Sequence, residues 1–82
     1  MEFWCLVKYF CQYDIYDKDV MVTHFKNQAE AVDCFNEYVE MYIDDLYIDE
    51  EETFIDVSED SYYFTYSDDD VEIEITLDKI VL

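Results

Sequence analysis

The chain has 82 residues, of which 52% are hydrophobic and 20% aromatic, and its formal net charge is −19. A disordered acidic tail would lack this aromatic content, so the composition predicts one folded domain over residues 1–82 with a modest core. The charge argues against direct binding to nucleic acid or to anionic membranes, because both would repel it, and favours basic proteins as partners.

The first 26 residues predict two strands joined by a polar loop. Residues 1–10, MEFWCLVKYF, are almost continuously apolar, which is typical of a strand buried on both faces. Residues 19–25, DVMVTHF, predict the second strand, and Tyr13 and Tyr16 in the loop are candidate contact residues. The chain has no glycine, so tight hairpin turns are disfavoured and longer loops with Asp and Asn are expected.

A helix is predicted from Asn27 to about residue 47, so that Tyr47 lies on it. Asn27 and Glu30 approximate a capping box, which would satisfy free amides in the first turn. Apolar residues recur at spacings of three and four and predict the face that packs on the sheet. These residues are Val32, Phe35, Val39, Tyr42 or Ile43, and Leu46. The acidic run at 49–52 predicts a loop after the helix.

Three strands are expected after this loop, at 53–59, 61–67 and 71–82. In the last of them, apolar residues from Val71 to Leu77 alternate with polar ones, so one face of the strand points to the core. The order ββαβββ predicts an α+β fold, with one mainly antiparallel sheet and a single helix packed on one face.

The acidic residues are concentrated in the last two thirds of the chain. Residues 27–82 hold nineteen acids and one lysine, and no basic residue lies between Lys26 and Lys79. An AT-rich genome would explain why Gly, Pro and Arg, which have GC-rich codons, are absent. Lysine has AT-rich codons, so its rarity needs another explanation. Adaptation to high salt would spread acids over the whole surface, whereas residues 1–26 are nearly neutral.

Five helix acids form a row along one face, because Glu30, Asp33, Glu37, Glu40 and Asp44 are spaced 3, 4, 3 and 4 apart. The row spans about 21 Å, with a carboxylate every ~5 Å. One DNA strand carries a charge every ~3.4 Å. Like-charge neighbours cost about 0.2–0.5 kcal/mol per pair, so a solvated helix face without a function would be expected to mix signs.

A rigid array of carboxylates could occupy the nucleic-acid groove of a DNA-binding enzyme, where it would pair with the cations that otherwise hold phosphates. The candidate partner-binding residues are Glu30, Asp33, Glu37, Glu40, Asp44, Asp45, Asp49, Glu50, Glu51, Glu52, Asp68, Asp69, Asp70, Glu72 and Glu74.

In composition and charge layout, the chain is similar to phage-encoded anti-restriction proteins, anti-CRISPR proteins and inhibitors of uracil-DNA glycosylase. The resemblance implies a DNA-mimic inhibitor of a defence or repair enzyme, and hence evasion of host defence. The alternative is an immunity protein or antitoxin that neutralises a basic nuclease toxin through specific contacts. A general acidic scaffold or a calcium binder is a third possibility.

Enzymatic and metal sites are not expected. A dyad of His24 with Cys5, Cys11 or Cys34 is possible, but a structural histidine is the expected role. The same four residues could bind zinc, although their spacing matches no common zinc site. Residues 67–74 offer oxygen ligands for calcium but lack the glycine and spacing of an EF-hand. We therefore expect no catalytic activity, no cofactor and no metal.

The cysteines and the hydropathy pattern bear on the compartment. Three cysteines without a CxxC pair do not suggest a disulfide framework, which favours a reducing environment. No signal peptide and no apolar stretch of membrane-spanning length is evident. The expected location is the cytoplasm of an infected or element-carrying bacterial host.

Overall fold

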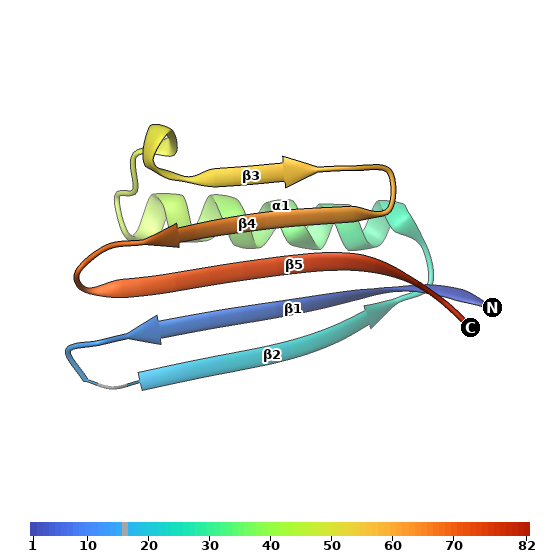
Figure 1. Ribbon diagram of the computed structural model, residues 1–82, viewed down its shortest axis with the longest axis horizontal. Helices are drawn as coiled ribbons and strands as arrows, with labels where there is room; N and C mark the ends of the chain where they lie inside the picture. Colours follow the sequence, from blue (N-terminus) through green and yellow to red (C-terminus); the bar gives the residue numbers. More distant parts are fainter. Residues whose placement is uncertain (16) are drawn as a thin grey trace.

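The computed structural model describes residues 1–15 and 17–82, which form a five-stranded antiparallel sheet with one helix packed against one of its faces (Figure 1). The predicted α+β fold, with the order ββαβββ, is confirmed. The elements are β1 (Glu2–Gln12), β2 (Asp17–Phe25), α1 (Gln28–Asp45), a single 3-10 turn η1 (Glu50–Glu52), β3 (Phe54–Val57), β4 (Ser61–Ser67) and β5 (Val71–Val81).

The strand order in the sheet is β2-β1-β5-β4-β3, so the first and last strands of the chain lie in its centre. β1 and β5 pair antiparallel from Glu2 opposite Val81 to Gln12 opposite Val71. This pairing joins the N-terminal hairpin to the C-terminal meander and brings the two termini together. There the Leu82 N–H donates to the Met1 carbonyl at 2.8 Å.

The core lies between α1 and the sheet face that the helix covers. The predicted alternation of β5 is confirmed, since its four core-facing residues are all buried. They pack with side chains from β1, β4 and α1. The principal core residues are Trp4, Leu6, Phe35, Val39, Tyr42, Phe64, Tyr66, Val71, Ile73, Ile75 and Leu77.

The prediction that β1 is buried on both faces is wrong. Cys5, Val7 and Tyr9 are only half-buried, because none of the described residues forms a second layer over the side of the sheet opposite α1. On the covered side, Lys8 is a buried cation whose Nζ lies 3.3 Å from Asp19 Oδ2 and 4.9 Å from the centre of the Tyr38 ring. The ammonium is therefore buried beneath α1 but pairs with a carboxylate that remains exposed on β2.

Burial by itself would lower the pKa of the Lys8 ammonium. Its interactions with Tyr42 and Asp19 act in the opposite direction and outweigh burial, so the net pKa of Lys8 is raised. Lys8 therefore remains charged at neutral pH. Its ammonium lies on the covered face of the sheet and not on the acidic surface.

Helix α1 begins where the sequence predicts. The Asn27 side chain caps it by accepting from the Glu30 N–H at 2.9 Å. The predicted apolar stripe is confirmed at Phe35, Val39 and Tyr42, whereas Leu46 is the C-cap and is 37% exposed. Ala31 takes the buried position at the start of the stripe, and Val32 and Ile43 are half-buried. The stripe therefore ends one turn earlier than predicted.

Several segments have bounds that differ from the predictions, and β1 extends to Gln12, two residues beyond its predicted end. The acidic run after the helix forms the turn η1 instead of a loop, because the Asp49 side chain accepts from the Glu51 N–H at 3.0 Å and caps it. β3 is limited to Phe54–Val57, which is shorter than the predicted strand at 53–59. β2 begins at Asp17, two residues earlier than predicted.

The turns show how the chain folds without glycine. In the β4–β5 turn, Asp68 Oδ1 accepts from the N–H groups of Asp70 at 2.7 Å and Val71 at 2.8 Å, as expected for an Asp-based turn. After α1, Tyr47 adopts a positive φ of 53°. The Ile48 N–H then donates to the Ile43 carbonyl at 3.0 Å, which closes a Schellman motif that usually has glycine at the position of Tyr47.

Candidate functional site

Acidic residues from segments far apart in the sequence meet at one end of the molecule. The end of α1, the turn η1 and the β4–β5 turn all lie on the left in Figure 1, together with the β1–β2 loop. The Tyr13 N–H donates to the Asp70 carbonyl at 2.9 Å and ties the loop to the turn. We call the exposed acids of the end of α1, of η1 and of the β4–β5 turn the acidic end; they are Asp44, Asp45, Asp49, Glu50, Glu51, Glu52, Asp68, Asp69 and Asp70.

The row of acids on α1 leads into the acidic end. Glu30, Asp33, Glu37, Glu40 and Asp44 are all exposed, as predicted. The ion pairs of the described residues are Lys8–Asp19, Lys79–Glu2 and Lys79–Asp60. Within residues 1–15 and 17–82, no acid of the helix row or of the acidic end is therefore paired with a lysine.

Glu72 and Glu74 belong to a different surface from the helix acids. They alternate with the core residues of β5, so they lie on the open face of the sheet, opposite α1, and both are half-buried. Glu72 Oε2 accepts from the Tyr13 hydroxyl at 2.9 Å. Because β5 is a central strand, these two glutamates face away from α1 and do not extend the helix row.

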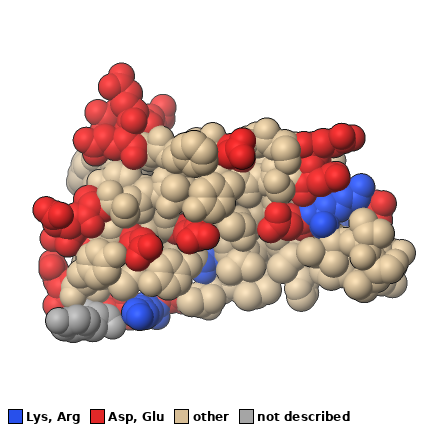
Figure 2. Space-filling model, viewed as in Figure 1, with Lys and Arg blue, Asp and Glu red and all other residues tan. Residues whose placement is uncertain are grey.

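The middle of the open sheet face has few charges. Figure 2 shows this face, with uncharged residues across most of its centre and acidic atoms gathered mainly toward its ends. Tyr13, one of the two candidate contact tyrosines, is 41% exposed beside the acidic end. Tyr16, the other candidate, lies outside the described residues.

Hydrogen bonds fix the position and the charge of one carboxylate at the acidic end. Asp68 Oδ2 accepts from the Tyr66 hydroxyl at 2.7 Å, while its other oxygen holds the turn amides. The hydrogen bond to Tyr66, followed by those to the backbone, lowers the pKa of Asp68, and burial opposes this only in part. Asp68 is thus held as an anion despite its acidic surroundings.

The hydrogen bond between Tyr66 and Asp68 also shifts the pKa of the tyrosine. The hydrogen bond to Asp68, followed by burial and by the negative charges of Asp68, Glu52 and Asp70, raises the pKa of Tyr66 to about 12. The charge of Glu52 on η1 therefore contributes to the raised pKa of Tyr66 on β4.

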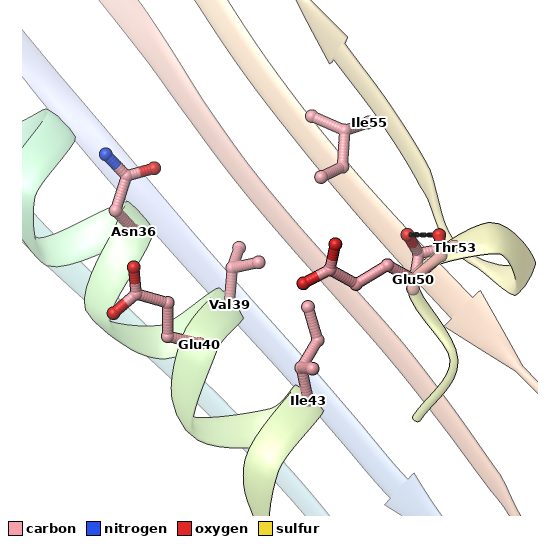
Figure 3. A pocket seen from close by; sticks show the side chains of 7 residues that line it. All are labelled: Asn36, Val39, Glu40, Ile43, Glu50, Thr53 and Ile55. Atoms are coloured by element: carbon pink, nitrogen blue, oxygen red, sulfur yellow. Dashed lines mark hydrogen bonds between the residues drawn. The ribbon is translucent and has the colours of Figure 1, made fainter. Parts of the chain in front are cut away.

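A groove with a volume of about 290 Å³ separates α1 from the edge strand β3 (Figure 3). Its lining residues are Asn36, Val39, Glu40, Ile43, Glu50, Thr53 and Ile55. Figure 3 shows the Glu50 side chain reaching from η1 toward the helix, between Ile43 and Ile55. The groove therefore combines an apolar floor with carboxylates contributed by two different elements.

The structure does not assemble the four residues considered for a zinc site. Cys5 lies directly across from His24 in the β1–β2 ladder, but Cys11 lies six residues further along β1 and Cys34 is on α1. The His24 ring packs edge-on against Phe3, with 5.3 Å between ring centres. In the part of the chain that the structure describes, no group of three or more His, Cys, Asp or Glu residues could hold a metal ion.

Sequence reasoning missed three exposed apolar or aromatic residues near the acids. Tyr47 is 94% exposed at the acidic end, although it was predicted to lie on the helix. Ile55 and Val57 on β3 are 50% and 57% exposed. For Tyr47, the apolar helix pattern continued to Leu46 and no glycine followed it, so the sequence did not mark the end of the helix there. The alternation of residues 53–59 could not show that β3 is an edge strand whose residues are exposed on both faces.

Comparisons with protein-family models, with curated proteins and with solved structures find no match to this chain. Among the described residues, no helix has the length and apolar character needed to cross a membrane.

Proposed function

We propose that this protein is a DNA-mimic inhibitor that occupies the nucleic-acid-binding groove of a basic enzyme, of the anti-CRISPR or anti-restriction type, in the cytoplasm of a bacterial host. The observation that carries the proposal is the surface formed by the helix row and the acidic end. Acids from three segments converge there without a lysine partner among the described residues. A basic groove would supply the missing cations.

The charge density of the molecule supports the proposal. Its longest axis measures 42 Å and its net charge is −19, which corresponds to about one charge per ~2.2 Å of length. Duplex DNA carries about one charge per ~1.7 Å of axis. The two densities are similar enough for cations arranged along a duplex to find a comparable number of anions on this protein.

The placement of the lysines also supports the proposal. Lys8 is buried under α1, and Lys79 bonds to Glu2 and Asp60 near the termini, opposite the acidic end. The ion-paired lysines therefore stabilise the fold away from the helix row, while Lys18 at the start of β2 and Lys26 before α1 make no ion pair with its acids among the described residues. The acids remain available to a partner, at the cost of repulsion within the folded protein.

An immunity protein or antitoxin for a basic nuclease is the second candidate function. The groove beside β3 and the exposed Tyr47 favour it, because apolar and aromatic anchors give specific contacts that imitation of phosphates does not require. In that case, the partner would be bound beside or away from its DNA groove.

Competition with duplex DNA distinguishes the two functions. The partner is first captured from host cells on the immobilised protein, then titrated with labelled duplex in the presence and absence of this protein. A DNA mimic excludes the duplex, and its affinity falls steeply as salt rises from about 0.05 to 0.2 M. A ternary complex with unchanged DNA affinity contradicts mimicry and favours specific contacts elsewhere.

A further inference from the structure

The groove between α1 and β3 contains an unusual combination of surfaces. Val39, Ile43 and Ile55 form its apolar floor, and Ile55 is 50% exposed although it belongs to a strand. Glu40 from the helix and Glu50 from η1 line the same groove, and neither has an ion pair among the described residues. An apolar floor and free carboxylates therefore share one small space.

These surfaces restrict what can bind. A purely cationic ligand would leave the apolar floor in water and gain nothing from it. A purely apolar ligand would remove water from Glu40 and Glu50 without offering them a partner, which is costly. An occupant that satisfies both must present an apolar side chain next to positive charge.

The size of the groove favours a protruding side chain of a protein over an enclosed small molecule. Pockets for small molecules usually measure about 300–1,000 Å³ and enclose most of the ligand. This groove has a volume of about 290 Å³ and lies between an edge strand and an exposed helix face. It can cover one aliphatic residue of a segment that runs along β3.

We propose that the groove binds an aliphatic side chain flanked by arginine or lysine in a segment of the protein partner. The inference rests on the proposed function, because it assumes a basic partner, and it adds a specific contact to the general attraction of the acidic surface. Such a contact would select one basic protein among many, since charge alone distinguishes them poorly.

Two synthetic peptides test the inference without an identified partner. One is Arg-Arg-Leu-Arg-Arg, and the other has serine in place of leucine and the same charge. Methyl NMR spectra of the full chain follow each titration. We expect the leucine peptide to bind about three- to tenfold more tightly and to shift the methyl signals of Ile43 and Ile55, while Ile80 on the opposite face remains unchanged.

Matched variants of β3 provide the control. Ile55→Thr should remove the advantage of the leucine peptide, whereas Val57→Thr, on the same strand outside the groove lining, should retain it. Equal affinity of the two peptides overturns the groove inference but leaves the proposed function intact. Absence of binding by both contradicts both proposals. Groove methyl signals that shift with protein concentration alone would identify a second copy as the occupant and overturn the inference.

Discussion

Tyr47 is the residue at which the lack of glycine has the clearest energetic consequence. It has a φ of 53° and is 94% exposed, so packing does not compensate for its left-handed conformation. A side chain with a Cβ costs about 1–2 kcal/mol in this region. Such a cost in a fully exposed aromatic residue at the acidic end makes Tyr47 a candidate for partner contact.

Replacing Tyr47 with glycine should therefore stabilise the protein. The relief of about 1–2 kcal/mol exceeds the entropy cost of glycine, about 0.5–1 kcal/mol, so we expect a net gain of about 0.5–1 kcal/mol in urea unfolding. Tyr47→Ala is the matched control, because it removes the ring and keeps the Cβ, and it should show no such gain. Equal stabilisation by both variants would contradict the account of strain.

The hydrogen bond from Tyr66 to Asp68 predicts a specific pH dependence. The pKa of Tyr66 is raised to about 12 in the folded state, so its contribution to stability is complete below the ordinary tyrosine pKa of about 10 and is lost as pH rises toward 12. Tyr66→Phe lacks this group. Its free energy of unfolding should fall less steeply than that of the wild type above about pH 10.

The acid side of the same profile has the opposite sign. The pKa of Asp68 is lowered in the folded state, chiefly by Tyr66, so its contribution is present above about pH 4 and is lost as pH falls further. Tyr66→Phe should weaken this loss as well. Wild-type and variant curves that stay parallel at both ends of the pH range would show that the hydrogen bond does not form in solution.

At the scale of elements, α1 combines one favourable terminus with one unfavourable terminus. Asn27 caps the N-terminus, where Glu30 also interacts favourably with the helix dipole. The last turn has no basic residue and carries Asp44 and Asp45, which oppose the dipole. The N-terminal cap and the apolar stripe must therefore stabilise a helix whose exposed face and C-terminus are both unfavourable.

The cap can be tested on its own. Asn27→Ala removes the acceptor for the Glu30 N–H and should destabilise the protein by about 1 kcal/mol, measured by urea unfolding. Asn27→Ser retains a capping oxygen and should stay within a few tenths of a kcal/mol of the wild type. A loss of the same size in both variants would mean that Asn27 acts through another contact.

The elements themselves were largely predictable because each follows from a local pattern. The alternation from Val71 to Leu77 and the cap at Asn27 depend only on neighbours in the chain, and both are confirmed. The end of the helix was predicted less well. Leu46 continues the apolar spacing, but the Schellman motif at Tyr47 and Ile48 ends α1 before it.

At the scale of the whole molecule, the arrangement of the acids depends on strand pairing that the pattern does not encode. The pairing of β5 with β1 places the Asp68–Asp70 turn beside the β1–β2 loop and turns Glu72 and Glu74 toward the open face. The groove depends on the distance between α1 and β3, which no local pattern contains. The acidic composition was readable from the sequence, but the acidic end was not.

Neutralising the centre of the helix row is the sharpest test of whether this row binds the partner. Asp33→Asn, Glu37→Gln and Glu40→Gln together remove three charges and touch all four like-charge pairs of the row. The control, Asp56→Asn, Glu59→Gln and Asp78→Asn, removes three exposed and unpaired acids elsewhere, so both variants have the same net charge. Affinity for the captured partner and urea unfolding are measured for both.

The helix variant should bind the partner about tenfold or more weakly, because cations in the partner lose their anions. Its free energy of unfolding should stay equal or rise by up to about 1–2 kcal/mol as repulsion is relieved. The control should bind within about twofold of the wild type. Equal loss of affinity in both variants, or loss of stability together with binding in the helix variant, would contradict the claim that this row is a binding surface.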